Sequence, residues 1–446
     1  MGDVKEQFGL LVRNRNFMKL FWGQIVSSSG DWLTTLALMS LVYRLTGSSL
    51  AVGGMVAFRV VPALFSGPIA AHITDRVDRR KLMIGCDISR GAIILAAPFM
   101  TRVWAVYVLV FFIEGISIVW LAARDASIPN LVDEKQLTMA NSLSMATTYG
   151  VIPLAAILFS FITVPSPLTR LFISGGFFAE HPTALAFFID SLTFFISATF
   201  FYRMHLLSPK DHMDMEQAPK FAESLTFAWR HPFTRSLMLG VAVGCMGGGS
   251  LYAVGIGYVK DVLGASSDAA FGLLMALFGL GMIAGVVALQ LLVHREEKPW
   301  MLRIALLVLG GIMVGMSFVH VAFIAYILAG FFGAAFGILF VIAVTMMQEH
   351  VIDADRGKAF AAFHAVSRIF LVIGAGVAGA IAGLFKVHTL SVFGISYTVY
   401  GFSVALFVAG VLIASVSVVP MGDKKDRMRD YFAREKPESL PKSSDA

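Results

Sequence analysis

The sequence predicts an all-α membrane protein with twelve transmembrane helices in two pseudo-symmetric halves of six. Three observations support this fold class. Hydrophobic residues make up 57% of the 446 residues and charged residues 14%, well below the roughly 25% charged residues of soluble domains. Apolar runs near the roughly 20-residue spanning length recur along the chain. Lys and Arg residues concentrate in alternate loops, which is typical of chains that cross a bilayer repeatedly.

The N-terminal half is expected over residues 18–204. A polar segment, residues 1–17, precedes it and lacks the short apolar core and small-residue cleavage site of a signal peptide, so we interpret it as a mature cytoplasmic end. Each span must be helical, because an open strand would leave backbone groups unpaired in hydrocarbon. The six predicted spans are 18–43, 50–73, 82–101, 103–125, 142–164 and 183–204.

The longest internal loop, residues 205–232, divides the spans six and six. Phe221, Leu225 and Trp229 recur in it at four-residue spacing, which predicts an amphipathic helix on the membrane surface; the alternative is a linker helix packed on the bundle. The C-terminal half is expected over residues 233–420, and the charged tail 421–446 is expected to be disordered. Its predicted spans are 234–260, 269–293, 300–319, 321–347, 360–385 and 395–420.

The distribution of Lys and Arg predicts the orientation of the chain. Of the 35 such residues, 27 fall at the termini or in the even-numbered loops, which places both termini on the cytoplasmic side of a cell (plasma or inner) membrane. Three more lie within spans, and five fall in odd-numbered loops: Arg44, Arg102, Arg170, Lys260 and Lys386.

Soluble-enzyme and cofactor chemistry has no motif in this chain. There is no phosphate-binding Gly-x-x-x-x-Gly-Lys-Ser/Thr loop and no zinc-ligand spacing, so we expect no enzymatic activity, no cofactor and no metal site. Cys86 and Cys245 lie in separate apolar spans without partner spacing. The net charge of +6 follows from the loop pattern and does not indicate nucleic-acid binding.

Ionisable residues inside predicted spans are candidates for coupling or substrate binding, because a charge in hydrocarbon is costly without a partner or cavity. The candidates are Asp31, Arg59, Glu114, Asp190 and Arg368. A carboxyl group shielded from water can alternate between protonated and ionised forms, and Asp31 and Glu114 suit that role, with Arg59 as a partner. The alternatives are static ion pairs for Asp31 and Arg59 and a solvated helix end for Asp190. His364, four residues before Arg368, could titrate near neutral pH, and a hydrogen-bonded packing role is the alternative for it.

A short basic loop follows the second span and reads Ala71-His-Ile-Thr-Asp75-Arg76-Val-Asp78-Arg79-Arg80-Lys-Leu82. This loop resembles the Gly-x-x-x-Asp-Arg-x-Gly-Arg-Arg signature of the major facilitator superfamily, with Ala71 and Asp78 in place of the glycines. The chain is also similar to the efflux branch that includes enterobactin exporters and macrolide efflux pumps. The stretches that carry this similarity are Arg13-Asn-Arg-Asn-Phe17, Ser29-Gly-Asp-Trp32, Asp87-Ile-Ser-Arg90, Val259-Lys-Asp-Val-Leu-Gly264 and Phe278-Gly-Leu-Gly281.

The resemblance implies a conformational latch at this loop. In relatives, the aspartate of the loop meets the start of the eleventh span and its arginine pairs with nearby acids. The latch residues implied here are Asp75, Arg76, Arg79, Arg80, Asp87, Arg90, Arg124 and Asp125. A purely topological role at the membrane surface accounts equally well for Arg79, Arg80 and Lys81.

The fifth span departs from the Gly-Pro-x-x-Gly-Gly pattern of antiport-type exporters, because Ile152-Pro153-Leu154-Ala155-Ala156 keeps only the proline. This departure argues against proton-coupled drug export in particular and leaves transport itself untouched. From the family resemblance we expect a secondary active transporter, with proton-coupled export of an amphipathic small molecule such as a drug, macrolide or siderophore-like compound as the first hypothesis. Transport of a specific metabolite, siderophore or metal ion is the alternative, and a non-transporting sensor or scaffold is the third. The expected partners of the monomer are its substrate, protons and membrane lipid.

Overall fold

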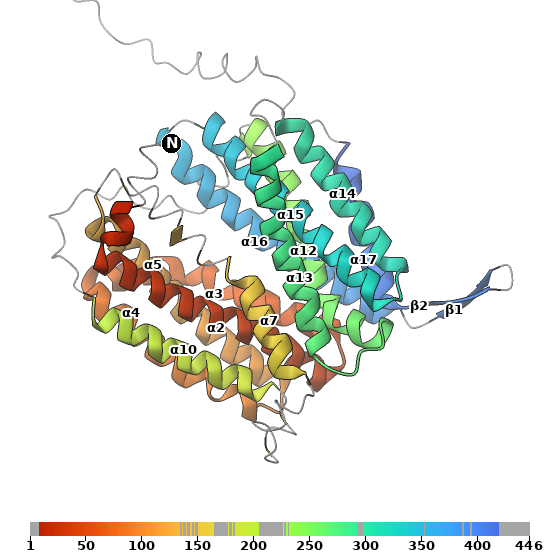
Figure 1. The fold of residues 1–446 in the computed structure, drawn as a ribbon, viewed down its shortest axis with the longest axis horizontal. Helices are drawn as coiled ribbons and strands as arrows, with labels where there is room; N and C mark the ends of the chain where they lie inside the picture. The colour runs from red at the N-terminus through yellow and green to blue at the C-terminus, as the bar shows by residue number, and fades with distance from the viewer. Residues whose placement is uncertain are drawn as a thin grey trace, which may run out of the picture.

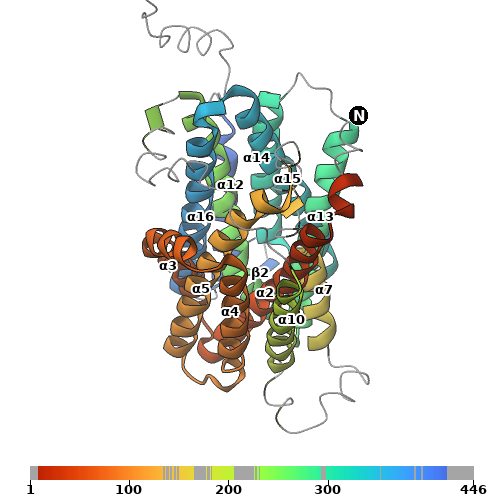
Figure 2. The ribbon, with the colours of Figure 1, turned by 90° about the vertical axis from the view of Figure 1, so that its left-hand side faces the viewer.

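The fold is a bundle of long helices in two groups, one from each half of the chain. Both views show the groups side by side, with the N-terminal helices in the lower part of the picture (Figure 1 and Figure 2). This computed structural model describes residues 9–133, 136, 140, 143–144, 147, 150–164, 177, 181, 183–204, 226, 229–230, 232–292, 298–351, 353–385, 388–392 and 395–418.

The helices of the N-terminal half begin and end at residues that suit helix caps. The Asn14 side chain accepts hydrogen bonds from the backbone N–H groups of Asn16 and Phe17 and so caps the start of α2 (Arg15–Thr46), whose C-cap residue Gly47 has φ 61°. The other described elements are α3 (Ser49–Arg76), α4 (Arg79–Ile94), the short 3₁₀ helix η1 (Ala97–Phe99), α5 (Val103–Leu131), α7 (Ile152–Thr163) and α10 (Ala184–Tyr202).

The C-terminal half contains the same kind of helices, together with a π-helical turn and a two-stranded hairpin. The π turn η3 (Tyr258–Val262) continues directly from α12 (Pro232–Gly257). The remaining elements are α13 (Ala269–Leu292), α14 (Lys298–Phe318), α15 (Ala322–His350), α16 (Asp353–Leu384), β1 (His388–Val392), β2 (Ile395–Val399) and α17 (Gly401–Val416).

A described helix coincides with each of the twelve predicted spans, and nine of these helices are long and apolar enough by themselves to cross a membrane. The prediction was wrong about the start of the last span. Residues 395–399 form strand β2, and the helix begins at Gly401. Hydropathy does not separate an apolar strand from an apolar helix, so the pattern extended the span too far. The predicted surface helix over Phe221 and Leu225 and the tail 421–446 lie outside the described residues.

Close approach between helix backbones depends on glycine at a few positions. A Cβ atom on Gly249 of α12 would overlap the carbonyl oxygen of Leu371 on α16, and one on Gly374 of α16 would overlap that of Met246 on α12. In a bilayer, helices gain little from excluding water from each other, so close van der Waals contact across small residues stabilises their association. The α12–α16 contact is therefore a tight backbone interface.

The described contacts between the two halves gather at one end of the bundle, which we call the closed end. This end carries the loops 47–48, 95–102 and 263–268. The Ser160 hydroxyl of α7 donates a 2.9 Å hydrogen bond to the carbonyl oxygen of Ala269 at the start of α13. A Cβ atom on Gly379 of α16 would lie 2.7 Å from the carbonyl oxygen of Ser49 at the start of α3. Residues 9–14 and the basic loop 77–78 lie at the opposite end.

Candidate functional site

Six ionisable side chains come together inside the N-terminal half, on five different helices. We call them the polar cluster: Asp31 of α2, Arg59 of α3, Asp87 and Arg90 of α4, Glu114 of α5 and Asp190 of α10. All lie in helices that cross the membrane by length and composition, or in α3 beside them. Four of the five intramembrane candidates predicted from the sequence belong to this cluster.

Arg90 is the buried centre of the cluster, with 2% of its side chain exposed. Its guanidinium pairs with the carboxylate of Asp87 one turn earlier on α4, and its Nη1 lies 3.5 Å from Oδ2 of Asp31 and 3.2 Å from Oγ of Ser117. The same guanidinium lies 4.3 Å from the ring centroid of Phe194 on α10. Carboxylates and an aromatic face together compensate a charge that is held away from water.

Arg59 and Glu114 form a second ion pair, with 2.5 Å between Arg59 Nε and Glu114 Oε1. Arg59 Nη1 also donates to the hydroxyl oxygen of Thr35 at 2.5 Å, and that hydroxyl donates to the carbonyl oxygen of Asp31 at 2.7 Å. Asp31 interacts electrostatically with both arginines and with Glu114. The Asp31 side chain is 34% exposed, so it connects the buried Arg90 pair to the more accessible Arg59 pair.

Asp190 lies at the contact between α10 and α2 and is 1% exposed. A Cβ atom on Gly30 would overlap Oδ1 of Asp190 and Oγ1 of Thr193, so only glycine at position 30 leaves room for these groups. The Thr193 hydroxyl donates to Asp190 Oδ1 at 3.2 Å. The alternative of a solvated helix end for Asp190 is wrong, because the seventh residue of α10 faces a neighbouring helix.

The cluster contains more acidic than basic groups. Four carboxyl groups (Asp31, Asp87, Glu114 and Asp190) face two guanidinium groups. If all six were ionised, two negative charges would remain uncompensated within the cluster, which is costly in a low-dielectric interior. Bound protons on one or two carboxyl groups remove that cost. The arrangement is therefore chemically suited to taking up and releasing protons.

The basic residues of the predicted latch bind within the N-terminal half. Arg79 Nη1 donates to the carbonyl oxygen of Ala126 on α5 at 2.6 Å, and Arg80 Nη2 donates to that of Tyr202, the last residue of α10, also at 2.6 Å. Arg124 pairs with its neighbour Asp125 at 2.6 Å. Arg79 and Arg80 therefore join the start of α4 to the C-terminal ends of α5 and α10.

The remaining latch and coupling candidates are not joined to the cluster by any contact that the described part of the chain contains. Arg76 is exposed, and the side chain of Asp75 lies outside those that the structure describes, as do those at the start of α16. Arg368 is exposed on α16, while His364 packs edge-on against the ring of Phe363. Its buried Nε2 has no hydrogen-bond partner within the described residues, so the contact shows packing without the expected hydrogen bond at that atom.

Sequence reasoning missed a set of polar contacts between the halves at the closed end. The Ser40 hydroxyl on α2 donates to the carboxylate of Asp268, which also pairs with Lys260 of the π turn at 2.5 Å. The Tyr43 hydroxyl donates to the carboxylate of Asp261 in the same π turn. Lys260 and Asp261 lie in a stretch that carries the family similarity, but no pattern in the sequence connects that stretch with α2.

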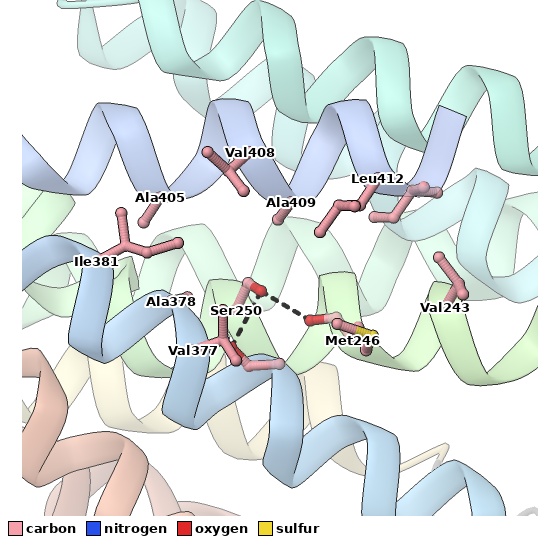
Figure 3. A pocket seen from close by; sticks show the side chains of 12 residues that line it. Val243, Met246, Ser250, Val377, Ala378, Ile381, Ala405, Val408, Ala409 and Leu412 are labelled. Atoms are coloured by element: carbon pink, nitrogen blue, oxygen red, sulfur yellow. Dashed lines mark hydrogen bonds between the residues drawn. The ribbon is translucent and has the colours of Figure 1, made fainter. Parts of the chain in front are cut away.

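A narrow pocket between α12, α16 and α17 has an apolar lining (Figure 3). Val243, Val377 and Leu412 are among the side chains around it. Its serine, Ser250, donates to the carbonyl oxygens of Met246 and Gly374 at 2.8 and 3.3 Å. Because the Ser250 hydroxyl already donates to these backbone carbonyls, the pocket offers a ligand few polar contacts. The polar cluster therefore remains the candidate site.

Comparisons with known proteins agree with the fold. The family model described as Major Facilitator Superfamily matches residues 20–375. The MFS-type transporter YfiS of Bacillus subtilis is 25% identical over 435 residues, covering 93% of this chain and 95% of the relative. Macrolide efflux protein A of Streptococcus pyogenes is 30% identical over 154 residues, 32% of this chain and 38% of the relative.

Solved structures share the fold at low sequence identity. A bacterial homologue of the human lysosomal transporter Spinster, in an inward-facing and unoccupied conformation, superposes with a TM-score of 0.68 at 13% identity over 91% of this chain and 94% of that one. The nucleoside transporter NupG has a TM-score of 0.66 at 12% identity over 90% of this chain and 97% of that one.

Proposed function

The chain belongs to the major facilitator superfamily, and we propose that it exports an amphipathic small molecule in exchange for protons by alternating access. It is a multi-pass membrane transporter with efflux proteins among its relatives. The coupling ion, the direction of transport and the substrate class are the proposed parts.

The observation that carries the proposal is the position of Asp31. Its partly exposed carboxylate lies beside Arg90, whose guanidinium also binds the buried Asp87, and beside the Arg59–Glu114 pair. A proton that enters or leaves Asp31 changes the charge balance felt by both arginines. Such a change can be transmitted to α3, α4 and α5 together. The Asp31–Arg90 pair joins α2 to α4, and the Arg59–Glu114 pair joins α3 to α5.

The contacts at the closed end support the proposal that this structure is a state of the transporter closed on the outer side. If the loops rich in Lys and Arg are cytoplasmic, the contacts of Ser40 and Tyr43 with the π turn lie on the outer side. The transporter is then in a state that is closed outwards, and export requires these contacts to break. Under the same assignment the arginines of the basic loop act on the inner side.

The proposal is tested by an efflux assay in cells that lack their own exporters, screened with antibiotics and fluorescent lipophilic cations. We expect cells with the protein to accumulate less of at least one probe, and a protonophore or Asp31→Asn to abolish the difference. Asp133→Asn, a change of an exposed acid at the end of α5, is the matched control. Full efflux in the presence of the protonophore would contradict proton coupling.

The same screen separates the two other functions. Sensitivity of the Asp31→Asn strain to a metal or siderophore without any drug phenotype favours a dedicated transporter for that solute. Within the described residues, no group of three or more His, Cys, Asp or Glu side chains is placed to hold a metal ion. A phenotype that persists when Asp31 and Glu114 are both replaced by alanine favours a sensor or scaffold.

A further inference from the structure

The hairpin formed by β1 and β2 projects from the bundle between α16 and α17 (Figure 1). Its strands pair antiparallel, and residues that face each other across the pair share one face of the hairpin. The register puts Leu390 with Tyr397 and Val392 with Ile395 on one face. The alternate positions, which form the other face, pair Thr389 with Thr398 and Ser391 with Ser396. The hairpin is therefore amphipathic, with an apolar face and a hydroxyl face.

An isolated two-stranded hairpin is only marginally stable in water and normally needs a third strand or a packed apolar surface. Within the described part of the chain, the strands pack extensively only against each other. Residues 388–399 contain no Asp, Glu, Lys or Arg, and His388 is their one imidazole. The apolar face therefore needs a partner that is itself apolar and does not require charge complementarity.

The ends of the hairpin are fixed beside exposed apolar side chains. The last residue of α16, Leu384, is 79% exposed, and Phe385 after it is 49% exposed. A Cβ atom on Gly401, the first residue of α17, would lie 2.5 Å from the carbonyl oxygen of Phe385. The two ends are thus held together next to exposed apolar side chains.

The length of α17 places the hairpin near the membrane surface. Its 16 residues give a helix of about 24 Å at 1.5 Å per residue, whereas the hydrocarbon core is about 30 Å thick. The apolar strand β2 precedes this short helix by a single residue, Tyr400. Tyr400 and Val399 continue the apolar stretch beyond Gly401, so the end of β2 that joins α17 lies at interfacial depth.

We propose that the apolar face of this hairpin lies on the lipid bilayer at the boundary between headgroups and acyl chains, and that the hydroxyl face points to water. The unpaired edges of a two-stranded sheet exclude a deeper position, because their backbone groups need water or headgroup partners. Contact with lipid supplies the apolar surface that the hairpin lacks, and aromatic residues such as Tyr397 and Tyr400 are typical of this depth.

The test uses single cysteines in a background where Cys86 and Cys245, both buried, are replaced by alanine. A small fluorophore is attached at Leu390→Cys or Val392→Cys on the apolar face, and at Thr389→Cys or Ser391→Cys on the hydroxyl face. The full-length protein is reconstituted into phosphatidylcholine vesicles with or without bromine on the acyl chains. Monodisperse elution before reconstitution confirms that each variant is folded.

We expect brominated lipid to quench the apolar-face probes several-fold more than their immediate neighbours, and soluble iodide to show the reverse order. Equal quenching of both faces would overturn the proposal. So would apolar-face probes that are shielded from both quenchers while Leu390→Cys cross-links two copies of the chain, because the occupant would then be a second copy. These outcomes do not depend on transport, so a failed efflux assay leaves this test unaffected.

Discussion

The contacts at the closed end predict a measurable shift between conformations when a single hydroxyl is removed. Ser40 is buried, and its hydroxyl donates across the interface between the halves to the buried carboxylate of Asp268. A hydrogen bond to a charged group contributes about 1.5–3 kcal/mol. The bond crosses the interface between the halves and breaks when they separate at the closed end, so Ser40→Ala should raise the ratio of protein open at this end to protein closed at this end roughly ten- to hundred-fold. Adding Tyr43→Phe removes the bond to Asp261 and should raise the ratio further.

Distances between nitroxide labels at Thr46 and Ser266, both exposed at the closed end, measure this ratio in nanodiscs. The expected result is a longer-distance population that grows from the parent protein to Ser40→Ala and again to the double variant. Ser415→Ala is the matched control, because that hydroxyl donates to Leu412 within α17 and crosses no interface. Unchanged distance distributions in both variants would refute the idea that these bonds hold the outer side closed.

Three further predictions concern stability, measured as thermal or denaturant unfolding of the purified protein. Asp87→Leu should lower the free energy of unfolding by about 3–5 kcal/mol because it leaves the buried Arg90 without its closest partner, and Arg90→Met in the same chain should recover most of that loss; no recovery would contradict a simple ion pair. Gly374→Ala should destabilise the α12–α16 contact, whereas Gly311→Ala, with open space around its Cβ position, should be neutral or stabilising by up to about 1 kcal/mol; equal effects would argue against the tight interface. Arg79→Ala should lower stability by about 1–2 kcal/mol through loss of its bond to a helix carbonyl, and an unchanged midpoint would show that the bond contributes nothing.

The span pattern predicted most of the fold because the bilayer limits the possible structures. Apolar runs must be helical in lipid, and the positions of Lys and Arg indicate how many times the chain crosses. The error at residues 395–399 arose where the chain leaves the hydrocarbon. Ile395 and Val399 are as apolar as the helix that follows, but at the interface water can satisfy a strand, so hydropathy alone no longer determines the secondary structure.

The candidate site was predictable as a set of residues but not as a network. A charge inside an apolar run is visible in the sequence, so Asp31, Arg59, Glu114 and Asp190 were identified. That Arg90 binds Asp31 depends on how α4 and α2 both pack against α10, which spacing within one helix cannot reveal. The closed-end contact of Ser40 with Asp268 was missed for the same reason, because it joins residues far apart in sequence and one of them is an ordinary serine.

Simultaneous measurement of substrate and proton movement tests the proposed coupling most directly. The protein is reconstituted into vesicles containing a pH-sensitive dye, and an imposed proton gradient drives uptake of ethidium or of another probe found in the efflux screen. The proposal predicts proton movement opposite to the probe in the parent protein and in Asp133→Asn, and loss of both the proton movement and the accumulation in Asp31→Asn. Accumulation against a gradient without proton movement, or unchanged exchange in Asp31→Asn, would contradict it.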